Sequence, residues 1–190
     1  MKKIIQLRGT NATGKTTAVR NFIARCDFCI QTIEVNGKRY NYSYDKGRNI
    51  IVAGRYDTRE CGGVDGEIQE KKVLQEYLYR LLKLLKPEAL IIDAVIYGLT
   101  FRFGYELMKV GEALGYHYIG IVCAPPLEVA LARLYGRNGG KLINEKNLQD
   151  KYFACLRAYE KSLEVGMDMR LVDTSTIPRE EAHTIIEAVL

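Results

Sequence analysis

Hydrophobic residues form two patterns along the chain: short continuous runs, and longer segments in which they recur every three or four positions. The continuous runs predict buried strands at 3–7, 90–95, 118–123 and 170–173. The periodic segments predict helices at 15–25, 67–86, 101–114, 128–135, 145–165 and 179–190. Strands that alternate with helices in this way form parallel βαβ units. The pattern therefore predicts an α/β fold built on a parallel sheet.

Residues 28–53 have a different pattern. Two runs rich in β-branched and aromatic residues, 28–35 and 38–44, flank Asn36-Gly37, a strong signal for a two-residue hairpin turn. A second turn leads into a further strand at 49–54. We therefore predict an antiparallel β-meander, inserted early in one domain that spans residues 1–190.

Three of the helices carry a predictable inward face. In 67–86, which Pro87 ends, the face comprises Leu74, Tyr77, Leu78, Leu81, Leu82 and Leu85. In 101–114 it comprises Phe103, Leu107, Val110 and Leu114. In 145–165 it comprises Leu148, Tyr152, Leu156, Tyr159 and Leu163.

Composition adds few constraints. The 190 residues are 47% hydrophobic and 27% charged, as in ordinary globular proteins. No apolar run is long enough to span a membrane, and the first residues lack a signal-peptide pattern, so we expect a cytoplasmic protein. The five cysteines include a C-x-x-C pair, Cys26 and Cys29, without the second pair that a zinc site requires. We expect free thiols.

The net charge of +5 is unevenly distributed. Residues 1–26 contain six Lys or Arg and no Asp or Glu, and residues 37–59 contain six against two. This excess favours a polyanionic partner, either nucleotide phosphates or a nucleic-acid backbone.

One segment matches the phosphate-binding pattern G-x-x-x-x-G-K-[ST] at every position: Gly9-Thr10-Asn11-Ala12-Thr13-Gly14-Lys15-Thr16. A strand precedes it and a helix follows, as the motif requires. Glycines let backbone N–H groups turn towards phosphates, and the helix N-terminus adds positive potential. Lys15 is predicted to reach the β- and γ-phosphates and Thr16 to bind Mg²⁺. The predicted nucleotide-binding residues are Gly9, Asn11, Ala12, Thr13, Gly14, Lys15, Thr16 and Thr17.

Other candidates surround this loop in the expected fold. Asp93 ends a buried strand, where it would hold Mg²⁺ through water or orient the acceptor. Arg133 and Arg137, spaced to share one helix face, precede a glycine-rich stretch, which predicts a catalytic lid over about 133–144.

Residues 54–66 follow a core strand and concentrate glycines, carboxylates and arginines, which predicts an acceptor site. Asp57 and Asp65 are the candidate general bases, with Asp65 slightly preferred. The predicted substrate-binding residues are Arg55, Tyr56, Arg59, Gly62 and Gly63. The sequence does not decide which of Asp57, Asp65 and Asp93 accepts the proton.

These residues resemble those of the P-loop nucleoside and nucleotide kinases. The resemblance covers nearly the whole chain and implies ATP as donor, Mg²⁺, and a three-layer fold with a five-stranded parallel sheet. Thymidylate kinases have Asp-Arg where this chain has Asp93-Ala94, and they lack the early meander. The combination of G-R-Y-D, C-G-G-V-D and R-N-G-G-K is more similar to bacteriophage kinases that phosphorylate 5-hydroxymethyluracil in DNA.

Three functions follow as hypotheses. The first, favoured by the basic residues at 37–59, is a kinase of a hydroxymethylated base in phage DNA, which would place the protein in the host cytoplasm. The second is a kinase of a free nucleoside or nucleoside monophosphate. The third is a P-loop ATPase or nucleotide-gated binding module without an acceptor, which the acidic and arginine-rich segment 54–66 disfavours.

Overall fold

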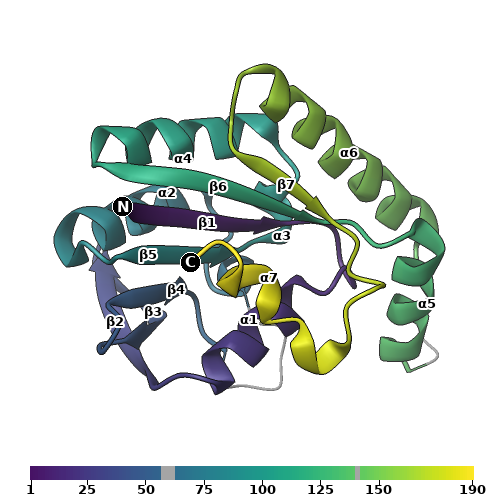
Figure 1. Cartoon of the computed structure of the whole chain (residues 1–190), viewed down its shortest axis with the longest axis horizontal. Helices are drawn as coiled ribbons and strands as arrows, with labels where there is room; N and C mark the ends of the chain where they lie inside the picture. The colour runs from purple at the N-terminus through teal and green to yellow at the C-terminus, as the bar shows by residue number, and fades with distance from the viewer. Residues whose placement is uncertain (57–62, 140–141) are drawn as a thin grey trace.

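A computed structural model describes residues 1–56, 63–139 and 142–190. Its centre is one seven-stranded sheet in the order β2-β3-β4-β5-β1-β6-β7 (Figure 1). The strands are β1 Lys2–Arg8, β2 Phe28–Val35, β3 Lys38–Asp45, β4 Ile50–Ala53, β5 Ala89–Asp93, β6 Tyr116–Cys123 and β7 Met169–Val172.

Helices cover both faces of this sheet. They are α1 Lys15–Ala24, α2 Lys71–Arg80, α3 Val95–Gly98, α4 Phe101–Ala113, α5 Leu127–Arg137, α6 Glu145–Glu164 and α7 Thr184–Glu187. Shorter segments are the 3₁₀ turns Val64–Gly66 and Arg179–Glu181 and the π-helical Leu81–Leu85. In Figure 1, α4 and α6 lie on one side of the sheet and α1 and α7 on the other. The predicted three-layer α/β fold is confirmed.

The sheet contains both the predicted parallel core and the predicted antiparallel meander, and has seven strands rather than five. Five strands, in the order β4-β5-β1-β6-β7, pair in parallel. The meander extends the same sheet, because β3 pairs antiparallel with both β2 and β4. β4 therefore serves both as the last strand of the meander and as the first of the parallel core.

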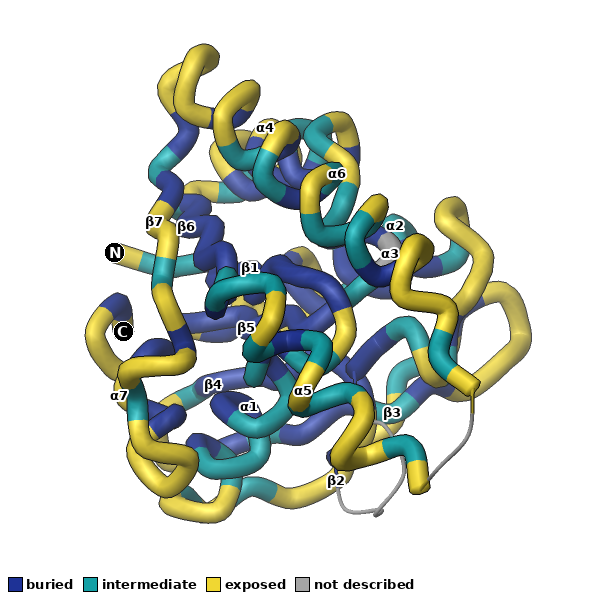
Figure 2. Tube along the Cα trace, turned by 90° about the vertical axis from the view of Figure 1, so that its right-hand side faces the viewer, coloured by how far each residue is buried: buried dark blue, intermediate teal, exposed yellow. Residues whose placement is uncertain are grey.

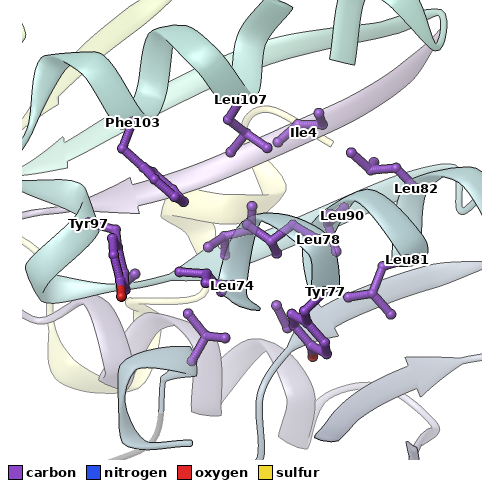
Figure 3. Packing of buried hydrophobic residues seen from close by; sticks show 14 of the residues in the cluster. Ile4, Leu74, Tyr77, Leu78, Leu81, Leu82, Leu90, Tyr97, Phe103 and Leu107 are labelled. Atoms are coloured by element: carbon purple, nitrogen blue, oxygen red, sulfur yellow. The ribbon is translucent and has the colours of Figure 1, made fainter. Parts of the chain in front are cut away.

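Alternate residues of the central strands feed two hydrophobic clusters. Ile4 of β1 and Leu90 of β5 point into the cluster beneath α2 and α4, whereas Ile5 and Ile91 point into the cluster beneath α1 and α7. Figure 3 shows Phe103 and Leu107 of α4 facing the side chains of α2, with Ile4 and Leu90 between them in this view. The burial map shows the central strands as the most buried part of the chain (Figure 2). The sheet's carboxyl edge is thereby fixed by packing on both faces.

Each of the three predicted helix faces is wrong in part, at Leu85, Leu163 and Val110. Leu85 is 37% exposed because it lies in the π-helical turn, whose wider i→i+5 spacing rotates the last residues away from the core. In α6 the fully buried positions are mostly small residues, and the predicted Leu163 is exposed. The buried positions of α6 are Leu148, Cys155, Ala158 and Ser162.

Smaller differences concern the ends and faces of the other elements. The strand predicted at 90–95 ends at Asp93, and α3 begins at Val95. α5 continues through Gly136 to Arg137. In α4, Val110 is exposed and Leu114 only partly buried, while Met108 faces the core. The closing helix predicted at 179–190 is a 3₁₀ turn followed by the short α7. Among the described residues, no helix is both long and apolar enough to cross a membrane.

Candidate phosphoryl-transfer site

The loop between β1 and α1 has the backbone geometry that its motif requires. Gly9 and Gly14 have φ angles of 139° and 94°, and Ala12 has a φ of 63°. A Cβ on Gly9 would lie 2.6 Å from the Cys123 carbonyl oxygen and 2.7 Å from Thr13 Oγ1, so only glycine fits there. Gly14 caps α1 without a side-chain hydrogen bond, and the first turn holds no acidic residue. Its N–H groups and helix dipole therefore favour an anion.

Lys15, Thr16 and Asp93 converge beside this loop. Lys15 is 3% exposed, and its ammonium donates to the Thr10 carbonyl oxygen at 2.8 Å. The Thr16 hydroxyl donates to Asp93 Oδ2 at 2.7 Å. Burial raises the pKa of Asp93, against the opposing effects of Lys15 and the Thr16 hydrogen bond. The arrangement places one buried cation and one buried carboxylate at the end of the central strands.

The acceptor-side segment packs directly onto Asp93. Gly63 has a φ of 112°, and a Cβ there would lie 3.0 Å from the Asp93 carbonyl oxygen. The turn Val64–Gly66 follows at once, and the Asp65 carboxylate accepts a hydrogen bond from the Val95 amide at the start of α3. Asp65 thus fastens the segment to the end of β5, a capping role that is compatible with a second role in the site.

A cavity of about 470 Å³ joins these parts. Its walls comprise the loop residues Asn11 to Thr17, the acidic and glycine residues Gly63, Asp65, Gly66 and Asp93, and Val95, Leu134, Arg137, Asn138 and Lys151. We call it the transfer cleft. It brings the predicted Lys15, Thr16, Asp65, Asp93 and Arg137 together in one space.

A second cavity of about 490 Å³ lies on the other side of the same loop. It shares Ala12, Gly14, Thr16, Thr17 and Arg137 with the transfer cleft. Its remaining walls are Arg20, Asn21, Arg133, Thr174, Ile177, Arg179, Ala182 and Ile185. We call it the donor pocket, because it combines cationic and apolar walls next to the phosphate loop.

The predicted residues are not all in these two cavities. Tyr56 is 7% exposed and packs in the core, and Arg55 is exposed; neither lines a cavity. Arg133 lines only the donor pocket, while Arg137 lines both. Asp57, Arg59 and Gly62 lie outside the described part of the chain, so their roles stay predictions. Lys141, which belongs to the predicted lid, also lies outside it.

Sequence reasoning missed two polar residues at the site, Lys151 and Thr174, and one buried arginine, Arg8, that lines neither cavity. Lys151 reaches the transfer cleft from α6, one turn before the buried Cys155. Thr174, after β7, contacts both α5 and the phosphate loop. The fully buried Arg8 donates to the Gly98 carbonyl at 2.7 Å. Of these residues, only Lys151 could have been found from the sequence, because it shares a helical face with apolar residues. No sequence pattern marks Thr174 or Arg8.

Comparison with known proteins fits this geometry. The chain is 27% identical over 180 residues to a "5-hmdU DNA kinase" of Pseudomonas phage M6, covering 92% of each chain. It is also 27% identical to a "5-hmdU DNA kinase" of Delftia phage PhiW-14 and to "5-hmdU DNA kinase 1" of Salmonella phage ViI. The chain is similar to phage DNA kinases. It spans only 65% and 66% of the last two relatives' own length.

Solved structures agree on the fold. The Deinococcus radiodurans tunicamycin resistance protein superposes with a TM-score of 0.54 at 17% identity, covering 100% of this chain and 96% of the other. A deoxyadenosine kinase from M. mycoides superposes with a TM-score of 0.51 at 15% identity, covering 97% of both. No family model matches the chain. The predicted P-loop kinase fold and the predicted resemblance to phage kinases are confirmed, and the relatives' names agree with a phosphotransferase.

Proposed function

We propose that this protein transfers the γ-phosphoryl group of ATP to the hydroxymethyl group of 5-hydroxymethyluracil in DNA. The observation that carries the proposal is the pair of cavities on either side of one phosphate loop, only one of which holds both Asp65 and Asp93. A donor and an acceptor can therefore meet over Lys15. The names of the three phage relatives supply the acceptor class.

The donor nucleotide fits the pocket that lacks carboxylates. Its phosphates would lie along the loop from Thr17 to Lys15, held by backbone N–H groups and by the buried ammonium. Its base would then extend between Arg133 and the apolar Ile177 and Ile185. An arginine face and aliphatic side chains suit a flat heterocycle without requiring a particular base.

The acceptor hydroxyl enters the transfer cleft opposite the γ-phosphate. Its oxygen forms a bond to the γ-phosphorus while the bond from that phosphorus to the β,γ-bridging oxygen breaks, and ADP leaves. The acceptor proton passes to a carboxylate, for which we propose Asp65 because it lines the cleft and, unlike Asp93, is not assigned to Mg²⁺. Arg137 and Lys151 then face the charge that spreads over the equatorial oxygens.

The oxygen atoms beside Lys15 fit Mg²⁺. Thr16 Oγ1 and Asp93 Oδ2 are 2.7 Å apart, and both line the transfer cleft. Within the described residues there is no cluster of three or more metal-ligating side chains, and Mg²⁺ bound with substrate phosphates needs only one or two carboxylates. When bound, Mg²⁺ would neutralise charge on the β- and γ-phosphates. We propose Thr16 and Asp93 as the residues that hold it.

DNA as the acceptor imposes one further requirement. A base within a duplex is buried in the stack, so it must rotate out to place its hydroxymethyl group in the cleft. Backbone phosphates on either side of the rotated nucleotide would then lie at the cleft mouth, where Lys151 and Arg137 provide positive charge.

The test is transfer of label from γ-³²P-ATP with Mg²⁺. The acceptors are DNA containing 5-hydroxymethyluracil, the same DNA containing thymine, free 5-hydroxymethyl-deoxyuridine, and thymidine with its monophosphate. The proposal requires alkali-stable label on the modified base of the first substrate only. Label in free nucleosides but not in DNA would support the second hypothesis. Release of inorganic phosphate with no labelled acceptor would support the third.

A further inference from the structure

One hydroxyl connects three of the segments that line the donor pocket: the phosphate loop, α5 and the residues after β7. Thr174 follows β7 and is 5% exposed. Its Oγ1 donates to the Thr13 carbonyl oxygen at 2.8 Å and accepts from Arg133 Nη1 at 3.2 Å. The Thr174 carbonyl oxygen accepts from Arg133 Nη2 at 2.9 Å. The donor and acceptor capacity of this hydroxyl is thus directed at the phosphate loop on one side and α5 on the other.

These contacts give the two arginines of α5 different positions. The Arg133 guanidinium is held by two parallel hydrogen bonds on Thr174, inside the donor pocket. Arg137, one turn later, has no such contact and lines both cavities. The sequence predicted that Arg133 and Arg137 act together on the transferred phosphoryl group. Their positions instead place Arg133 beside the donor base and Arg137 beside the phosphoryl group.

We infer that Thr174 is a positioning residue that holds Arg133 in the donor pocket and couples its position to the phosphate loop. The inference rests on the proposed function, because it assigns the pocket to the donor nucleotide. Side-chain methyl packing contributes separately: a Cβ on Gly14 would lie 3.5 Å from Thr174 Cβ and Oγ1, so the residue also fills space beside the loop. A test must separate the hydroxyl from the shape of the side chain.

Thr174→Val removes the hydroxyl and keeps the shape, whereas Thr174→Ser keeps the hydroxyl. Loss of both Oγ1 hydrogen bonds, one of them charge-assisted, should weaken ATP binding by about 5- to 30-fold. We expect the KM for ATP of Thr174→Val to rise by that factor, with kcat and the KM for the acceptor within about two-fold. Thr174→Ser should restore the wild-type KM. Thr176→Val is the matched control, because the Thr176 hydroxyl donates only to Asp173 O within the same loop.

A double-mutant cycle tests the coupling to Arg133. Arg133→Met should raise the KM for ATP at least as much as Thr174→Val, and the double variant should be no worse than Arg133→Met alone. Additive effects would overturn the inference, as would a Thr174→Ser variant as impaired as Thr174→Val. Wild-type ATP affinity in Thr174→Val would also overturn it.

Binding of a fluorescent ATP analogue is measured in parallel with turnover. If the protein has a different acceptor or none, the affinity ratios still test Thr174, while the proposed function fails separately in the labelling assay. Thermal unfolding of each variant shows whether a change in affinity reflects a loss of folded protein. An equal loss of affinity and of melting temperature in Thr176→Val would assign the effect to the loop as a whole and overturn the inference.

Discussion

Replacing Lys15 by methionine is the sharpest test of the phosphate loop. The ammonium is 3% exposed and donates to the Thr10 carbonyl oxygen at 2.8 Å, so a phosphate would meet it in a site with little water. A charge-assisted hydrogen bond of this kind contributes about 3 kcal/mol, equivalent to about 100-fold in affinity. Methionine keeps the buried stem of the side chain. We therefore expect the free energy of unfolding of the nucleotide-free variant to differ from that of the wild type by no more than about 1 kcal/mol.

The assay is the shift in Tm produced by Mg-ATP. At an ATP concentration about 100 times the Kd, binding stabilises the wild type by about 2.7 kcal/mol. For a chain of this length that raises Tm by about 5–10 °C. If Lys15→Met weakens binding about 100-fold, the same ATP concentration contributes about 0.4 kcal/mol, a shift of about 1 °C.

Lys83→Met is the control, since Lys83 lies in the π-helical segment and packs on the Tyr79 ring, away from both cavities. It should keep the full shift. A Lys15→Met variant that retains the ATP-dependent shift together with wild-type turnover would refute the assignment of the phosphate loop, and the roles proposed for both cavities with it.

Three further variants test individual residues. Asp65→Asn keeps an oxygen that accepts the hydrogen bond from the Val95 N–H, but it cannot take up a proton. The kcat should therefore fall by about 10²- to 10⁴-fold at unchanged ATP affinity. A wild-type kcat would leave Asp65 only its capping role. Lys151→Met should raise the KM for DNA and lower the magnitude of the slope of log affinity against log salt by about 0.7–0.9; an unchanged slope would contradict the proposed contact with a backbone phosphate. Arg8→Met removes the side-chain donor to the carbonyl oxygens of Gly98 and Thr100. The free energy of unfolding, measured with urea, should therefore fall by about 2–4 kcal/mol. An equal or higher free energy of unfolding would contradict this role.

The parts of the site that the sequence predicts are those that are local in the chain. The phosphate loop, from Gly9 to Thr16, contains its own glycines, its lysine and its helix start, so a motif suffices to find it. Asp93 is found because a carboxylate ends a continuous apolar run. The parallel order of the strands also follows from the alternation of runs and helices, since helical crossovers join parallel neighbours.

The parts that the sequence misses depend on contacts between distant segments. Arg8 has its partners at Gly98, Thr100 and Ser162, which no local pattern connects. The same contact explains the error in α6. A buried guanidinium needs oxygen acceptors, so the helix turns Ser162 inward and leaves Leu163 exposed. Hydrophobic periodicity cannot anticipate a face chosen by a buried polar group.

The arrangement of the sheet explains why one loop can serve two cavities. β1 lies between β5 and β6; the chain leaves β1 towards α1 on one face of the sheet and leaves β5 towards α4 on the other, an arrangement at which ligands bind in open α/β sheets. Residues after β5 and before α2 build the transfer cleft, and residues after β7 build the donor pocket. Among the described residues, Gly63, Asp65, Gly66, Asp93, Val95, Leu134 and Lys151 line the transfer cleft and not the donor pocket, so a change of acceptor is expected to act on this side. One departure from the thymidylate kinase pattern, Ala94, lies between Asp93 and Val95 of this cleft, which is where an acceptor base carried by DNA would require a different fit.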